Sequence, residues 1–166
     1  MEAITHILTG VILQILSFRL LITPWNYLLT IILAFISHFL IDAVAKITYH
    51  TAEPMKDDTF WVIWHIIVIL ISIIFTIIFI NPYWIGILSA NFVDIWDWII
   101  IRIIYSKYIL TPDKNKSSKI IYIHTFIDKI RERFFSWLPN LNYKKIGILP
   151  EIFIISGLLI IIFILK

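Results

Sequence analysis

The sequence predicts an all-α integral membrane protein, a bundle of four to five transmembrane helices with one cytoplasmic amphipathic helix. Of its 166 residues, 60% are apolar and only 15% are charged. The charged residues avoid long runs of Ile, Leu, Phe and Trp, a pattern that water-soluble domains of this size do not show. Several runs reach the roughly 20 residues that cross a bilayer. We therefore expect a single transmembrane domain over residues 1–166.

The first two apolar runs lie close to the N-terminus. Residues 3–21 are long enough to cross the membrane if Arg19 extends its charge to the interface. A re-entrant helix is the alternative, and it would reduce the spans to four. The run has no charged leading segment and no small-residue cleavage site, so we expect it to be retained. The second run, residues 25–45, follows Pro24, a residue suited to the first turn of a helix, and carries Trp25 as an interfacial anchor.

The third and fourth runs are separated by a turn signal. Residues 60–80 are almost entirely Ile, Val, Phe and Trp, and the Asn-Pro-Tyr sequence at 81–83 predicts a tight turn. Residues 84–104 are then expected to return across the membrane, carrying Asp94 and Asp97. An uncompensated Asp near the centre of a span costs about 2.5–3.5 kcal/mol, so both carboxylates are functional candidates.

An amphipathic stretch, residues 119–137, precedes the final apolar run at 146–165. Its basic residues gather away from the apolar ones, so we interpret it as a helix lying on the membrane surface. The apolar residues recur at three- and four-residue steps: Ile120, Ile123, Ile127, Ile130 and Phe134.

The distribution of basic residues predicts the topology. Ten of the 14 Lys and Arg residues lie between Arg102 and Lys145, which makes that connection cytoplasmic. The loop at 46–59 and the N-terminus are then also expected inside. In this topology all five histidines fall on the cytoplasmic side: His6, His38, His50, His65 and His124.

A repeated His-x-x-x-Asp spacing points to metal chemistry. His38 and Asp42 lie four residues apart and share one face of a helix, and His124 and Asp128 repeat that spacing. Imidazole and carboxylate suit a divalent ion, Zn²⁺ first and Mn²⁺ or Fe²⁺ as alternatives, which activates water for hydrolysis. We expect one or two ions, because the candidate ligands exceed what one ion needs: His6, His38, Asp42, His50, Asp94, Asp97, His124 and Asp128.

Three segments also carry a resemblance to a known family: Thr5-His6-Ile7-Leu8-Thr9-Gly10, Ser37-His38-Phe39-Leu40-Ile41-Asp42 and Asn91-Phe92-Val93-Asp94-Ile95-Trp96-Asp97. The chain resembles the prokaryotic membrane-bound metal-dependent hydrolases, themselves distantly similar to zinc-dependent phospholipase C and P1-type nucleases. The resemblance implies metal positions at His6, His38 and Asp42, with Asp94 as the Asp of the family's Pro-Asp motif. Val93 stands where the family usually has Pro, and the family's His-Arg-x-x-x-His-Ser segment is reduced to His124.

Together these features predict a metal-dependent hydrolase in the cytoplasmic membrane of a prokaryote, with its N-terminus inside. The expected reaction is phosphoester hydrolysis in a lipid or lipid-linked substrate at the cytoplasmic leaflet. Asp42 and Asp94 are the candidate catalytic groups, and Lys46 or Arg131 would steady a phosphate. Membrane lipids are the expected partners. No nucleic acid is expected, because the chain offers no aromatic and basic platform on an aqueous face.

Two other classes of protein remain as alternatives. A small transporter or proton relay would use Asp94, Asp97 and His65, although the outer halves of the helices offer no chargeable group to continue the path. A non-catalytic membrane scaffold would use the polar pairs to hold helices together. The absence of Cys excludes disulfides, Cys-ligated zinc, iron–sulfur clusters and a thiol nucleophile. The sequence leaves the oligomeric state open.

Overall fold

The structure is a computed structural model that describes residues 2–49, 57–101, 103 and 123–166. Throughout these residues the chain forms helices joined by turns, which confirms the all-α class. Within the part of the chain that the structure describes, four helices are long and apolar enough to cross a membrane. Large apolar side chains point outward along them, with Ile77 70% exposed and Phe163 85% exposed, as expected of a surface solvated by lipid. The chain is therefore an all-α membrane bundle.

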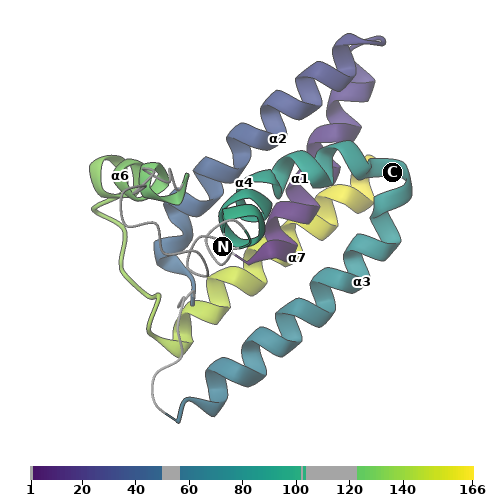
Figure 1. The fold of residues 1–166 in the computed structure, drawn as a ribbon. Helices are drawn as coiled ribbons and strands as arrows, with labels where there is room; N and C mark the ends of the chain where they lie inside the picture. The colour runs from purple at the N-terminus through teal and green to yellow at the C-terminus, as the bar shows by residue number, and fades with distance from the viewer. Residues whose placement is uncertain (1, 50–56, 102, 104–122) are drawn as a thin grey trace.

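The helices of the described residues are, in chain order, α1 (Ala3–Leu20), α2 (Trp25–Val44), α3 (Thr59–Ala90), α4 (Phe92–Asp94), α6 (His124–Phe134) and α7 (Ile148–Leu165) (Figure 1). Three short turns adjoin them, the 3₁₀ turns η1 (Ala45–Ile47) and η3 (Lys145–Gly147) and the π-helical turn η2 (Ile95–Ile100). Helices α1, α2 and α7 begin and end within a few residues of the expected spans. The first part of the expected surface helix, residues 119–122, lies outside the described residues.

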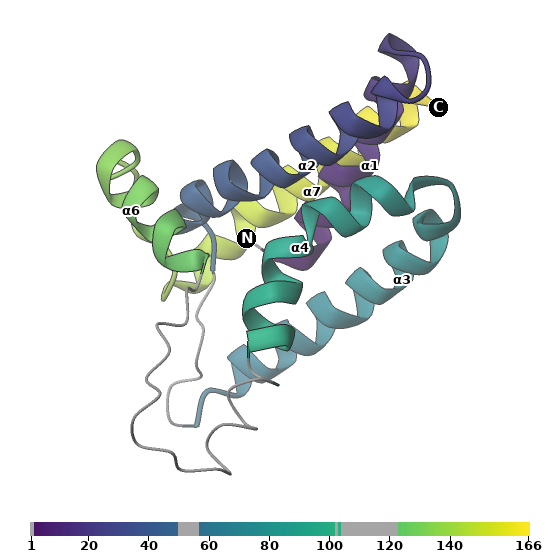
Figure 2. The same ribbon diagram turned by 45° about the horizontal axis from the view of Figure 1, so that its top comes forward.

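Helix α3 reverses direction at the predicted turn. Tyr83, directly after Pro82, has non-helical dihedral angles (φ −128°, ψ 26°), because a proline inside a helix removes a backbone donor and crowds the preceding turn. The helix therefore consists of a long arm, 59–82, and a short arm, 84–90, which folds back toward the other helices (Figures 1 and 2).

The expected fourth span, 84–104, is not one straight helix. The short arm ends at Asn91, where φ is −99° and ψ is 4°, and the chain bends into α4 and η2 (Figure 2). The Asn91 side-chain amide donates to the carbonyl of Ile87 at 2.8 Å, the kind of local hydrogen bond by which Asn competes with helix continuation. The bend sets the direction of the segment that carries Asp94 and Asp97.

Helix α1 lies at the centre of the bundle. In the most apolar 18-residue stretch of each spanning helix, the share of that stretch that is buried is 61% for α1, 33% for α2, 17% for α3 and 11% for α7. Leu8 and Val11 of α1 have no exposed surface, and the core around them draws on α3 through Phe79 and Ile87 and on α7 through Ile162. Helices α2, α3 and α7 therefore pack around α1, and α6 packs against α2 (Figure 1).

A glycine pair holds α1 against the short arm of α3. A Cβ atom at Gly10 would lie 2.3 Å from the carbonyl oxygen of Gly86, and one at Gly86 would lie 2.1 Å from that of Gly10. Gln14 joins the same contact, because its amide nitrogen donates to the Pro82 carbonyl at 3.2 Å and its oxygen accepts from the Gly86 N–H at 2.8 Å. In a regular helix those two backbone groups pair with each other, so Gln14 satisfies the groups at the kink.

The first prediction concerns this contact. We expect Gly10→Ala and Gly86→Ala each to lower the free energy of unfolding by at least about 1–3 kcal/mol, because backbone must move to admit the methyl group. The measurement is thermal unfolding in detergent, with Gly157→Ala as control, since a Cβ at Gly157 meets no atom within 4 Å. Equal melting temperatures for the three variants would contradict the packing described.

Candidate metal centre

Four side chains converge at one end of α2. His38, Asp42, Asp94 and His124 each offer one ligand atom, and the four atoms lie within 4.8 Å of one another. His38 Nε2 is 3.2 Å from Asp42 Oδ2 and 3.8 Å from Asp94 Oδ1, and His124 Nε2 is 3.3 and 3.4 Å from the same two oxygens. Ligands at the vertices of a zinc tetrahedron with bonds of about 2.0–2.1 Å lie roughly 3.3 Å apart. The four distances are close to that value, and the group could hold a metal ion.

Three separate elements bring these ligands together. His38 and Asp42 occupy successive turns of one face of α2, Asp94 ends α4 directly after the bend at Asn91, and His124 begins α6. His38 and Asp42 are buried, while the side chains of Asp94 and His124 keep 30% and 27% of their surface exposed. The α2 side of the centre is therefore buried, and its partial exposure is on the side of α4 and α6.

The backbone orients the His38 ring. His38 Nδ1 lies 2.7 Å from the carbonyl oxygen of Ala90. A carbonyl can only accept, so Nδ1 carries the proton and Nε2 presents its lone pair to the centre. Ala90 is the last residue of α3, where carbonyls lack intrahelical partners. The bend after Ala90 thus provides an acceptor for His38, a contribution that no side-chain motif in the sequence signals.

Asp97 orients the second imidazole. Its Oδ2 lies 2.7 Å from His124 Nδ1, and its two oxygens also accept from the backbone N–H groups of Ile123 and His124 at 3.0 and 2.8 Å. A carboxylate on the far nitrogen of a ligating histidine fixes the tautomer and the direction of the ring. Asp97, a candidate ligand by sequence, therefore lies behind His124 and positions it.

His6 reaches the centre from α1. Its Nε2 lies 3.0 Å from Asp42 Oδ1, and its ring stacks on His38 with centroids 4.1 Å apart. Asp42 thus turns one oxygen toward His38 and His124 and the other toward His6. His6 is not one of the four candidate ligands. It contacts Asp42, which is one of them.

The other candidate residues from the sequence either lie away from the group of four or fall outside the described residues. The Asp128 side chain is 57% exposed and pairs with Arg131 Nη1 at 2.8 Å. Lys46 donates to the Ser136 carbonyl at 3.2 Å. His65 contacts Trp61, one turn earlier in α3, through a hydrogen bond of 2.8 Å and ring stacking. His50 falls outside the described residues.

Arg131 places a positive charge beside the centre. Its Nη2 and Nε donate to the backbone carbonyl of Asp42 at 2.8 and 3.3 Å. The guanidinium links α6 to the turn of α2 that carries a ligand. It thereby holds His124 and Asp42 on facing helices.

The site attracts positive charge. Burial alone would lower the pKa of His124, but hydrogen bonds to Asp42, Asp94 and Asp97 outweigh that effect and raise the pKa to about 10. Three carboxylates therefore surround one imidazole in a partly desolvated position. Such surroundings favour a bound cation.

Comparisons of the chain with models of protein families, with characterised proteins and with solved structures found no match. The description of the centre therefore rests on the residues and geometry of this chain.

The second prediction is metal retention. Zinc-loaded protein, dialysed in detergent, is expected to keep about one equivalent, because a single group of four ligands fits one tetrahedral ion. The His38→Ala/Asp42→Ala double variant should keep none, as measured by elemental mass spectrometry. Asp128→Ala is the matched control, since it belongs to the other His-x-x-x-Asp pair, and it should bind like the wild type. Equal zinc in all three proteins would contradict the assigned ligands.

The third prediction concerns the residue behind His124. Asp97→Asn keeps the shape and one acceptor but removes the charge, and we expect metal affinity to fall by about 10- to 100-fold. Competition with a chromophoric chelator measures this directly. If affinity stays unchanged while Asp97→Ala lowers only thermal stability, Asp97 serves solely to cap the start of α6.

Proposed function

We propose that this protein is a membrane-embedded metal-dependent hydrolase with one divalent ion, zinc in the first instance, held by His38, Asp42, Asp94 and His124. The observation that carries the proposal is the spacing of two imidazole nitrogens and two carboxylate oxygens, 3.2–3.8 Å, which matches a tetrahedral ligand set. Two of the ligands are buried in an apolar bundle, where ionisable groups are costly and mark functional sites.

The chain's own groups support hydrolysis. A divalent ion held by these four side chains would take a water as a fifth ligand on the exposed side of Asp94 and His124. It would lower the pKa of that water and polarise the ester under attack. Ala90 and Asp97 hold the two imidazoles in the orientation that ligation requires. The partial exposure of Asp94 and His124 leaves one side of the centre open to a substrate.

Asp94 is the best-placed proton acceptor. Asp42 is held between His6, His38 and His124, so its oxygens are already engaged. Asp94 contacts the two ligating imidazoles through Oδ1, and its side chain keeps 30% exposure. We assign Asp42 the role of ligand and Asp94 the roles of ligand and general base.

The substrate class we propose is a phosphoester in a lipid or lipid-linked molecule. The centre lies at one end of a bundle whose outer surface is apolar, and it is flanked by amphipathic α6 with exposed Phe126 and Phe134. Such a helix lies at the headgroup level of a bilayer. Arg131 adds the positive charge that attracts a phosphate, and Lys46 remains a second candidate for this role. The excess of Lys and Arg between residues 102 and 145 supports placing this end at the cytoplasmic leaflet.

The fourth prediction tests the reaction. Protein in detergent with zinc or manganese should release inorganic phosphate from p-nitrophenyl phosphate or from dioleoyl phosphatidic acid. Chelation should abolish the activity and added metal should restore it. Asp42→Ala should be inactive because a ligand is lost, and Glu132→Ala should retain full activity because Glu132 is an exposed acid of α6 outside the group of four.

Two results would replace the proposal by the alternatives. If metal binds and raises the melting temperature but no phosphoester or carboxylic ester is hydrolysed, the ion is structural and the protein is a scaffold. If chelation changes neither stability nor any activity, the cluster works without metal, as a proton relay or an interhelical clamp.

A further inference from the structure

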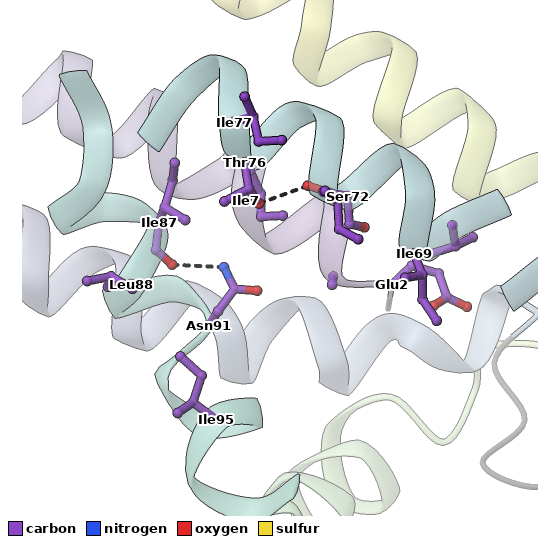
Figure 3. A pocket seen from close by; sticks show the side chains of 13 residues that line it. Glu2, Ile7, Ile69, Ser72, Thr76, Ile77, Ile87, Leu88, Asn91 and Ile95 are labelled. Atoms are coloured by element: carbon purple, nitrogen blue, oxygen red, sulfur yellow. Dashed lines mark hydrogen bonds between the residues drawn. The ribbon is translucent and has the colours of Figure 1, made fainter. Parts of the chain in front are cut away.

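Two apolar cavities lie on either side of the short arm of α3. The larger, of about 470 Å³, lies between α1, the long arm of α3 and the short arm with its continuation to Ile95 (Figure 3). The smaller, of about 310 Å³, lies between α2 and the short arm, which continues to Phe92. Leu88 lines both cavities. It therefore forms a ridge that separates two parallel spaces.

The lining of both cavities suits hydrocarbon. Isoleucines of α3 dominate the larger cavity, and the hydroxyl of Thr76 there donates to the Ser72 carbonyl at 2.8 Å (Figure 3). Ile31, Phe35 and Phe92 dominate the smaller one. Both lie along helices of the membrane-spanning bundle, so an acyl chain enters them without leaving an apolar environment and needs no hydrogen bonds there.

Both cavities are lined by residues of the segment 87–95, which carries Asp94, while none of the four candidate ligands lines either cavity. In the smaller cavity, Ile31 and Phe35 continue the face of α2 that carries His38 and Asp42, since the four positions recur at steps of four, three and four residues. Ile31 lies seven residues before His38, which is about 10 Å along the helix. The smaller cavity therefore lies on the same face of α2 as His38 and Asp42, about one to two turns nearer the middle of the span.

The lining of the larger cavity includes residues that are next in sequence to residues at the centre. Ile7 follows His6, Asn91 follows Ala90, and Ile95 follows Asp94. The Asn91 amide is turned to the Ile87 carbonyl at 2.8 Å, so this end of the cavity keeps its polar group satisfied (Figure 3). From there the cavity runs along the long arm of α3 to Ile77.

From this arrangement we infer that the substrate is a lipid with two hydrocarbon chains, which straddle the short arm of α3 with one chain in each cavity. Its phosphoester then lies at the group of four ligands, beside Arg131. The inference rests on the proposed function for the reacting group. The number of chains rests independently on two cavities that share Leu88 and are both lined by the segment that carries Asp94.

The test fills each cavity separately. Thr76→Phe adds a ring to the larger cavity and Ser89→Phe to the smaller. Ile74→Phe and Ile32→Phe are matched controls, because both residues are exposed and line neither cavity. The substrates are dioleoyl phosphatidic acid, its one-chain lyso form and p-nitrophenyl phosphate. Metal content, measured for every variant, establishes that the centre is intact.

We expect each cavity-filling variant to raise KM for the two-chain lipid by about 10-fold or more, with kcat/KM for p-nitrophenyl phosphate unchanged. The one-chain lipid should be affected by only one of the two variants. Both control variants should behave as wild type. Unchanged KM for the two-chain lipid in both filling variants, with metal retained, would overturn the inference.

A binding measurement separates this inference from the proposed function. Native mass spectrometry of wild type in mixed micelles should detect retained phosphatidic acid in preference to its lyso form, and Thr76→Phe and Ser89→Phe should each lose that preference. If the preference is present without any hydrolysis, the proposed function fails and the two-chain site stands. If the preference is absent while p-nitrophenyl phosphate is hydrolysed, the inference fails alone.

A change from dimer to monomer caused by either filling variant would also overturn the two-chain inference, since the cavities would then be an interface between two copies.

Discussion

The carboxylate of Asp42 is the group on which the rest of the centre depends. It is buried in an apolar bundle, and three imidazoles approach it from three helices: His6 of α1, His38 of α2 and His124 of α6. A buried charge needs such partners, because neither lipid nor apolar side chains replace its hydration. The same contacts that satisfy Asp42 thereby fix how α1 and α6 sit against α2.

Interruptions of the helices supply what regular helices cannot. Pro82 reverses α3, and Gln14 bridges the backbone groups at that kink. The bend at Asn91 ends the short arm at Ala90, whose carbonyl orients His38. The π-helical turn η2 that follows carries Asp97, the partner of His124. Because backbone polar groups must be satisfied inside a membrane, the kink at Pro82 and the bend at Asn91 are each matched by a specific polar partner.

The centre and the cavities belong to one arrangement around the short arm. Gly86 of the short arm packs against α1 so closely that a Cβ atom would not fit. Leu88 lines both cavities, and the carbonyl of Ala90 at the end of the arm contacts His38. A shift of this arm would therefore change the ligand geometry and the shape of both cavities together. In the function that we propose, binding of the chains and orientation of the reacting ester would then depend on the same element.

The sequence by itself determined the class and much of the candidate ligand set. Apolar runs of span length dictate membrane helices, since lipid leaves the backbone few other ways to satisfy its hydrogen bonds. The four-residue step from His38 to Asp42 places both on one helical face, because that spacing is nearly one turn. Tertiary structure alone decided the rest. It selected Asp94 and His124 as their partners, put Asp97 behind the imidazole and left Asp128 exposed, because those outcomes depend on where the chain bends and which helices meet.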